Sequence, residues 1–231
     1  MTRAVLLDLY GTLIEPDWGA LTAGRDAIAD RVGVPRAAAH AAWATTHEAR
    51  MRGLHGSLEG DLAAVLATAG GVGSDLLTDD LLAGLAAFER ANWRRGVRLY
   101  PDVVPMLGRL RRAGARLAIV TNSSAEAAAV IPALRLSELV DVVLASCDAG
   151  SVKPDLLVLA MRKLGVTRAE AVLVDDEPAQ IEAARRMGLD TILIRRVAAG
   201  RSVAGAAPGA AVRDLTGVAE LVFGALPTPP G

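Results

Sequence analysis

Polar side chains stand at the ends of several apolar runs in this sequence, where they could act together on a charged ligand. Three runs end in this way: "AVLLD" ends at Asp8, "LAIVTN" ends at Thr121 and Asn122, and "AVLVDD" ends at Asp175 and Asp176. Carboxylates that lie close together cannot all stay ionised without a compensating charge. Mg²⁺ would supply that charge, because it is a hard cation that binds carboxylate oxygens and water. The run ends therefore predict a magnesium site.

The apolar runs themselves predict the strands of a parallel sheet. They lie at residues 4–8, 117–122, 140–146, 171–176 and 191–194, with helix-like segments between them. Continuous Val, Ile and Leu runs are typical of strands covered on both faces, and the intervening helices indicate right-handed crossovers. We therefore expect a doubly wound α/β core. Ligands bind at the carboxyl ends of such strands, so the polar run ends should meet there, joined by Lys153 from the loop after the third run.

A long stretch between the first two runs contains no comparable strand. Its pattern predicts helices at residues 19–32, 36–52, 57–69 and 78–95. An all-helical insertion of this size is too long for a simple crossover, so we expect it to form a small bundle of its own over the sheet. The expected division is a core domain of residues 1–15 and 97–231 and a helical cap domain of residues 16–96.

The rest of the chain is expected to complete the core. A turn at Pro101 and Asp102 should lead into a helix that ends at Gly114. The Ala- and Gly-rich stretch 197–212 is expected to be a loop that carries one edge strand, and a short helix should follow within 214–226.

The overall composition limits the classes of partner. The chain has 25 Lys and Arg against 26 Asp and Glu, a net charge of −1, so no overall field attracts nucleic acid or an anionic membrane. No apolar run approaches the roughly 18 residues of a membrane span, and the N-terminus lacks the pattern of a signal peptide. The single cysteine, Cys147, excludes an intramolecular disulfide. We expect a cytoplasmic protein, monomeric or homodimeric, without nucleic-acid or membrane partners.

Four motifs occur in order around the expected cap. They are "DLYGT" at 8–12, "VTNSS" at 120–124, "GSVKPD" at 150–155 and "VLVDDEPAQ" at 172–180. In these motifs, and in the place of the helical insertion, the chain resembles the haloacid dehalogenase-like (HAD) hydrolase superfamily, in its subfamily with a helical cap inserted after the first strand. The resemblance covers residues 1 to 196 and implies a hydrolase with a Rossmannoid core.

The resemblance implies catalytic roles for four residues. Asp8 matches the nucleophile, which forms a covalent aspartyl intermediate that water then hydrolyses. Thr121 matches the hydroxyl that holds the transferring group, with Asn122 beside it. Lys153 matches the lysine that orients the nucleophile and offsets negative charge. In a phosphoryl transfer such groups mainly position the reactants and neutralise charge.

The resemblance also implies metal and substrate contacts. Asp175 and Asp176 match the acidic pair that positions Mg²⁺, together with Asp8 and the backbone carbonyl of Tyr10. The substrate would be a small anionic molecule. Its expected contacts are Gly11, Thr12, Thr121, Asn122 and Lys153.

Tyr10 separates two interpretations of this site. In the superfamily's phosphatases the residue two positions after the nucleophile is usually an aspartate that acts as general acid. A phenol with a pKa near ~10 is a poor proton donor at neutral pH, and loss of a positioned acid typically costs about 10²- to 10⁴-fold. Tyrosine here resembles the 2-haloacid dehalogenases, in which halide leaves without a proton. Those enzymes, however, dispense with Mg²⁺ and lack the acidic pair, and they carry a cap arginine where this chain has Ala44.

Three functions follow from these observations. We expect a Mg²⁺-dependent phosphohydrolase that favours good leaving groups, such as acyl or aryl phosphates, because protonation of the leaving group is then less needed. The alternatives are a 2-haloacid dehalogenase-like hydrolase and a binding protein that has lost turnover. In the cap, Arg25, Arg50 and Arg52 could select an anionic substrate, or they could be solvated surface residues.

Overall fold

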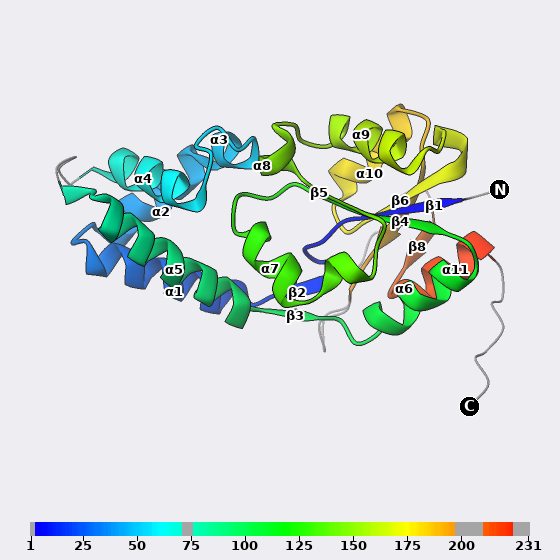
Figure 1. Ribbon diagram of the computed structural model, residues 1–231, viewed down its shortest axis with the longest axis horizontal. Coiled ribbons are helices and arrows are strands. Elements are labelled where there is room, and N and C mark those ends of the chain that lie inside the picture. Colours follow the sequence, from blue (N-terminus) through cyan, green and yellow to red (C-terminus); the bar gives the residue numbers. More distant parts are fainter. Residues whose placement is uncertain (1–2, 71–75, 197–209, 224–231) are drawn as a thin grey trace.

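The computed structural model describes residues 3–70, 76–196 and 210–223. Within these ranges a six-stranded sheet has helices on both faces, and five further helices lie together beyond one end of it (Figure 1). The strand order is β5-β4-β1-β6-β7-β8, and every neighbouring pair is parallel. This arrangement confirms the expected doubly wound α/β fold.

All five predicted strands are present, together with an edge strand. The bounds are β1 Ala4–Leu7, β4 Arg116–Thr121, β5 Val142–Ala145, β6 Ala171–Asp175, β7 Asp190–Ile194 and β8 Ala210–Val212. β1 lies at the centre, where Leu7 is the register partner of both Ile119 and Val174. β8 is the expected edge strand, while the preceding stretch 197–209 lies outside the described residues. The register brings the carboxyl ends of β1, β4 and β6 to one edge of the sheet.

Helices cover both faces of this sheet. One face packs against α6 Val103–Arg112, α7 Ala127–Ala133 and α11 Leu215–Phe223, and the other against α9 Asp155–Leu164 and α10 Pro178–Arg186. Three short helices lie in the connections before and after β5 and before β6: η2 Leu136–Glu138, α8 Ser146–Ala149 and η3 Arg168–Glu170. α6 ends just before Gly114, as expected, and Gly114 has a φ of 86°. Among the described residues, no helix is both long and apolar enough to cross a membrane.

We refer to α1–α5 as the cap helices. Their bounds are α1 Trp18–Arg31, α2 Arg36–Thr45, α3 His47–Met51, α4 Leu58–Ala69 and α5 Asp79–Arg95. They share a buried apolar cluster of their own, which includes Ile28, Trp43, Leu62 and Leu85. Side chains of Asp17, Ser57 and Thr78 accept hydrogen bonds from the first turns of α1, α4 and α5. Caps of this type stabilise a helix by about 1 kcal/mol each.

The single helix expected at 36–52 is wrong, because the chain breaks at Thr46 between α2 and α3. The hydroxyls of Thr45 and Thr46 donate to the carbonyl oxygens of Ala41 and Ala42, at 2.9 and 2.8 Å. Hydroxyls that bond four residues back compete with the helical ladder and bend helices. After the break, Arg50 on α3 donates a hydrogen bond to Ser124, which follows β4 of the sheet.

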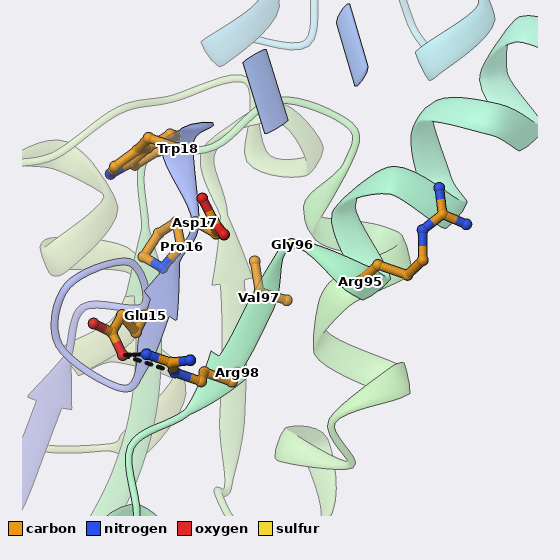
Figure 2. Close-up of a pocket in the computed structure, with 8 residues that line it drawn as sticks. All are labelled: Glu15, Pro16, Asp17, Trp18, Arg95, Gly96, Val97 and Arg98. Carbon is orange, nitrogen blue, oxygen red and sulfur yellow. Dashed lines mark hydrogen bonds and ion pairs between the residues drawn. The ribbon is translucent and has the colours of Figure 1, made fainter. Parts of the chain in front are cut away.

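Two short strands that the sequence analysis did not predict join the cap helices to the sheet. β2 Ile14–Pro16 and β3 Val97–Leu99 pair in antiparallel fashion, and Arg98 forms an ion pair with Glu15 at 2.8 Å. Residues of both strands line a hollow of about 320 Å³ (Figure 2). Trp18 at its rim is 58% exposed, whereas the side chain of Arg95 points away from it. We refer to β2 and β3 as the linkers.

Candidate functional site

The predicted site residues converge at the carboxyl edge of the sheet. Asp8 extends β1 by one residue, because its amide donates to the carbonyl oxygen of Val174 at 2.9 Å. Asn122 follows β4, and Asp175 is the last residue of β6. A pocket of about 370 Å³ opens between them, and its lining residues are Asp8, Tyr10, Asn122, Lys153, Asp175, Asp176, Glu177 and Pro178.

Lys153 connects the acidic residues of the pocket. Its Nζ donates to Oδ1 of Asp8 at 2.7 Å and to Oδ2 of Asp175 at 2.6 Å. The backbone amide of Lys153 donates to Oδ1 of Asn122 at 2.8 Å, which fixes the loop that carries the lysine. The side chains of Lys153, Asp8 and Asp175 are only 3%, 9% and 1% exposed. Water therefore does little to screen the interaction between these three charges.

Burial dominates the acid–base properties of the pocket. It raises the pKa of Asp8 to about 7, although the charge of Lys153 opposes the change. Burial, reinforced by the charge of Asp175, raises the pKa of Asp176 to about 6. For Lys153 burial acts in the opposite direction, but its contacts with Asp8 and Asp175 outweigh it and raise the pKa of the ammonium. Three carboxylates thus share one ammonium, and ionisation of all three needs a further positive charge.

The three carboxylates could hold a metal ion. Oxygen atoms of Asp8, Asp175 and Asp176 all lie within 4.8 Å of one another. Oδ1 of Asp175 accepts the amide of Glu177 at 2.9 Å, which orients that carboxylate. Gly11, with a φ of 76°, lies against Asp176, and a Cβ there would come within 2.2 Å of Oδ2. A donor set made only of carboxylate oxygens fits a hard divalent cation, so these residues are compatible with Mg²⁺.

Two predicted hydroxyl residues lie beside this pocket without lining it. The hydroxyl oxygens of Thr12 and Thr121 are buried and have no hydrogen-bond partner among the described residues. Arg196 holds the carbonyl oxygen of Thr12 through Nε at 3.0 Å and Nη2 at 2.7 Å, which fixes the first motif loop. Unpartnered buried hydroxyls are uncommon in folded proteins, and both residues are fully buried.

Tyr10 both lines the pocket and packs beneath the cap helices. Its ring lies 5.5 Å from that of Trp93 on α5, at an interplanar angle of 57°. Its hydroxyl oxygen is buried and has no hydrogen-bond partner among the described residues. Burial, together with the charges of Glu126 and Asp8, raises the pKa of the phenol well above its ordinary value. Tyr10 therefore stays protonated at neutral pH and cannot act as a base.

A buried polar cluster that the sequence did not predict lies between the cap helices and the sheet. Arg50 donates through Nη1 to the hydroxyl of Ser124 at 3.1 Å, and that hydroxyl also bonds the buried carboxyl of Glu126. The other nitrogens of Arg50 donate to Thr46 Oγ1 and Trp43 O at 3.2 and 2.9 Å. Ser124 belongs to a recognised motif, but nothing in the sequence links it to a residue 74 positions away. The cluster attaches α3 to the loop that begins at Asn122.

Comparisons with known proteins agree with this geometry. A family model described as haloacid dehalogenase-like hydrolase matches residues 2–188. Phosphatase MT3486 of Mycobacterium tuberculosis (strain CDC 1551 / Oshkosh) is 33% identical over 132 residues, which are 55% of this chain and 58% of that protein. The chain thus matches less than two thirds of that relative. Phosphoglycolate phosphatase of Rhodospirillum rubrum is 27% identical over 202 residues, which are 84% of this chain and 80% of that protein.

Solved structures of both reaction types share the fold. A 2-haloacid dehalogenase from Pseudomonas syringae pv. tomato DC3000 superposes with a TM-score of 0.75 at 23% identity, over 96% of this chain and 98% of that one. A HAD phosphatase from Thermococcus onnurineus superposes with a TM-score of 0.65 at 20% identity, over 98% of this chain and 100% of that one. At these identities the likeness establishes the fold and leaves the reaction to the site residues.

Proposed function

Because the chain belongs to the haloacid dehalogenase-like hydrolase family, we propose that it is a Mg²⁺-dependent phosphohydrolase of small phosphorylated metabolites with good leaving groups. The observation that carries this proposal is the group of three carboxylates around Lys153, with oxygens within 4.8 Å of one another. Such a group suits a cation and, through it, a phosphoryl group. Relatives named as phosphatases support the same reaction.

Asp8 would act as the nucleophile. Lys153 holds Oδ1 of Asp8, which leaves Oδ2 free to attack phosphorus. The new Oδ2–P bond forms as the bond from phosphorus to the leaving oxygen breaks, and that oxygen keeps the electron pair. Water then attacks the phosphorus of the aspartyl phosphate, which releases inorganic phosphate and restores Asp8.

The remaining residues of the site would bind and neutralise the phosphoryl group. Thr121 and Asn122 would donate to its oxygens, and Lys153 would offset part of its charge. Mg²⁺ held by Asp8, Asp175 and Asp176 would supply further neutralisation when bound. We also propose that residues 16–96 act as a cap domain that encloses the substrate against this pocket.

Tyr10 would restrict the range of substrates. Its phenol is protonated but too weakly acidic to give a proton to an alkoxide at a useful rate. Leaving groups that are stable as anions, such as carboxylates and phenolates, need no such proton. We therefore expect acyl and aryl phosphates to react faster than alkyl phosphates.

The test is phosphate release from acetyl phosphate and p-nitrophenyl phosphate, with Mg²⁺ and with EDTA. Asp8→Asn keeps the size of the side chain and removes the nucleophile. We expect release that requires Mg²⁺ and is at least about 10³-fold slower in Asp8→Asn. Release that is equally fast in Asp8→Asn, or absent from the native protein, would refute the proposal.

Tyr10 supports a second candidate function, displacement of halide from a 2-haloacid. Tyrosine stands at this position in the dehalogenases that the sequence resembles, and the reaction needs no proton donor. In that case Asp8 would attack carbon and the halide would leave with the bonding electrons. Chloride or bromide release from 2-haloacids that persists in EDTA would select this function over phosphate hydrolysis.

A further inference from the structure

The three arginines expected to select an anionic substrate occupy different environments. Arg52 is 41% exposed and pairs with Glu48 one helical turn away on the surface. Arg50 is buried, and each of its three guanidinium nitrogens already donates a hydrogen bond. Arg25 on α1 is partly exposed, at 23%, and lies between aromatic rings. Only Arg25 combines access to solvent with a position on the inner side of the cap helices.

Arg25 is held firmly but only along one edge. Its guanidinium carbon lies 4.1 Å from the centre of the Trp43 ring and 5.8 Å from that of Trp93. Its Nε donates to Oε1 of Glu89 at 3.3 Å. Among the residues that the structure describes, neither terminal nitrogen of Arg25 forms a hydrogen bond. The two stacking contacts and the one ion pair thus orient the guanidinium and leave two parallel donors available.

The carboxylate of Glu89 already accepts hydrogen bonds from other side chains. It is 1% exposed, and it also accepts from Asn92 Nδ2 at 3.3 Å and from Trp93 Nε1 at 3.0 Å. Gly24 allows α1 to pack closely against α5 at the same place, since a Cβ there would come within 2.0 Å of Asn92 Nδ2. The carboxylate of Glu89 thus accepts hydrogen bonds from three side chains, and Arg25 uses only its Nε there.

Arg25 is connected to the pocket through two aromatic side chains. Trp93, on which Arg25 stacks, also packs against Tyr10, and the charge of Arg25 acts on the phenol of Tyr10. Tyr10 lines the pocket, and its buried hydroxyl has no hydrogen-bond partner among the described residues. Glu126, whose carboxyl also interacts with the charge of Arg25, is buried, and that burial raises its pKa. Arg25 thus stacks on the same ring, that of Trp93, that packs against a lining residue of the pocket.

We infer that Arg25 binds a carboxylate on the leaving group, so that the substrates are small phosphorylated carboxylic acids. Two parallel N–H donors match the two oxygens of a planar carboxylate, and a charge-assisted pair of this kind is about twice as strong as a neutral one. This inference rests on the proposed phosphohydrolase function and names its substrate class. Arg25 would be a specificity residue and would take no part in the displacement at phosphorus.

The test compares matched substrates with and without a carboxylate. One pair is 4-carboxyphenyl phosphate and phenyl phosphate, and a shorter pair is 2-phosphoglycolate and ethyl phosphate. Within at least one pair we expect Arg25→Gln to lower the ratio of kcat/KM values, carboxylated over uncharged, by about 10- to 100-fold. Arg52→Gln, a matched change on the outer surface, should leave the ratio unchanged. Ratios in both pairs that stay within about 3-fold in Arg25→Gln would overturn the inference.

A second variant and a binding measurement keep the test independent of folding and of turnover. Arg25→Lys keeps the positive charge beside Glu89 but loses the two parallel N–H donors. Its ratio of kcat/KM values should therefore fall less than that of Arg25→Gln. If Arg25→Gln is unfolded, the ratio measured for Arg25→Lys decides the test. Glycolate should change the tryptophan emission of the native protein and of Asp8→Asn but not of Arg25→Gln, with ethylene glycol as the uncharged control. If no substrate releases phosphate, the proposed function fails while this titration still decides the role of Arg25. A native protein whose emission glycolate leaves unchanged would then overturn the inference.

Discussion

At the scale of single residues, Lys153 sets the charge balance of the pocket. Its ammonium is almost fully buried and contacts Asp8 and Asp175 at 2.7 and 2.6 Å. Paired buried charges give little net stability, but removal of one partner is costly because the other charge is left uncompensated. The lysine and a divalent cation would both compensate the same carboxylates, so each should reduce the protein's need for the other.

Lys153→Met should therefore make stability depend strongly on Mg²⁺. We expect the free energy of unfolding to fall by about 3–5 kcal/mol, because two buried carboxylates lose their partner. Thermal unfolding with Mg²⁺ and with EDTA measures the effect, and Mg²⁺ should raise the Tm of the variant more than that of the native protein. Lys163→Met, on the exposed side of α9, is the control. It should change neither the free energy of unfolding nor the effect of Mg²⁺ on Tm. A Tm of Lys153→Met that does not respond to Mg²⁺ would contradict the proposed metal site.

Glu126 should make the free energy of unfolding depend on pH. Burial raises the pKa of its carboxyl above the ordinary value of 4.5, although the Ser124 hydroxyl, Arg25 and Arg50 oppose the change. The folded protein therefore holds this proton more tightly than the unfolded chain does, and stability falls as pH rises above about 4.5 until the folded group ionises.

Glu126→Gln removes this ionisation while it keeps the shape of the side chain. We expect the free energy of unfolding of Glu126→Gln, relative to the native protein, to rise as the pH increases above the ordinary pKa of 4.5. Urea unfolding at several pH values measures the difference. Glu182→Gln, an exposed change on α10, should show no such trend. A difference for Glu126→Gln that is constant with pH would show that Glu126 ionises normally in the folded protein, and a difference that falls would show that its pKa is lowered.

At the scale of elements, α3 is held against the sheet domain by a close backbone contact as well as by Arg50. A Cβ placed on Gly53, just after α3, would lie 1.9 Å from the carbonyl oxygen of Cys147 in α8. Gly53 also has a φ of 65°, which disfavours any side chain there. Gly56 has a similar φ of 75° but no atom within 4 Å of its Cβ position. The two glycines thus separate the effect of backbone strain from that of the contact.

Gly53→Ala should lift α3 from α8, whereas Gly56→Ala should not. Both substitutions carry a backbone cost of about 1–2 kcal/mol, so Tm should fall in both. Only Gly53→Ala should also weaken the contact between Arg50 and Ser124 and lower kcat/KM, by about 10-fold or more. Steady-state kinetics at a temperature where both variants are folded measures the difference. Equal kcat/KM values for the two variants would show that this contact does not support activity.

The sequence predicted long elements well and short or interrupted ones poorly. The five main strands were predicted because unbroken apolar runs are a strong local signal, as in "AVLL" of β1, which is fully buried. The two linkers were missed, since three residues beside a long helix carry no separate pattern, whereas the equally short β8 was expected as an edge strand in a loop-like stretch. The break between α2 and α3 was missed for a related reason: two adjacent threonines are ordinary in a helix until their hydroxyls bond back to the carbonyls.

At the scale of the whole molecule, the convergence of the site could be predicted, but the contacts across it could not. Parallel strands carry their ends to one edge, so Asp8, Asp175 and Asp176 were expected together, and the structure places all three in one pocket. Arg25 and Arg50 could not be assigned from sequence. Their surroundings depend on how α1, α3 and α5 pack against the motif loops, and that packing is specified by side chains far apart in the chain.

The paired linkers also bear on how a protein of this kind could change over generations. Pro16 and Val97 are register partners, so the chain leaves the sheet domain and returns to it at neighbouring points. A gene could gain, lose or exchange everything between them without re-threading the six-stranded sheet. The residues that carry out the reaction at Asp8 and the helices that select its substrate could then evolve separately. Recombination at the two linkers could give the same reaction a new set of substrates.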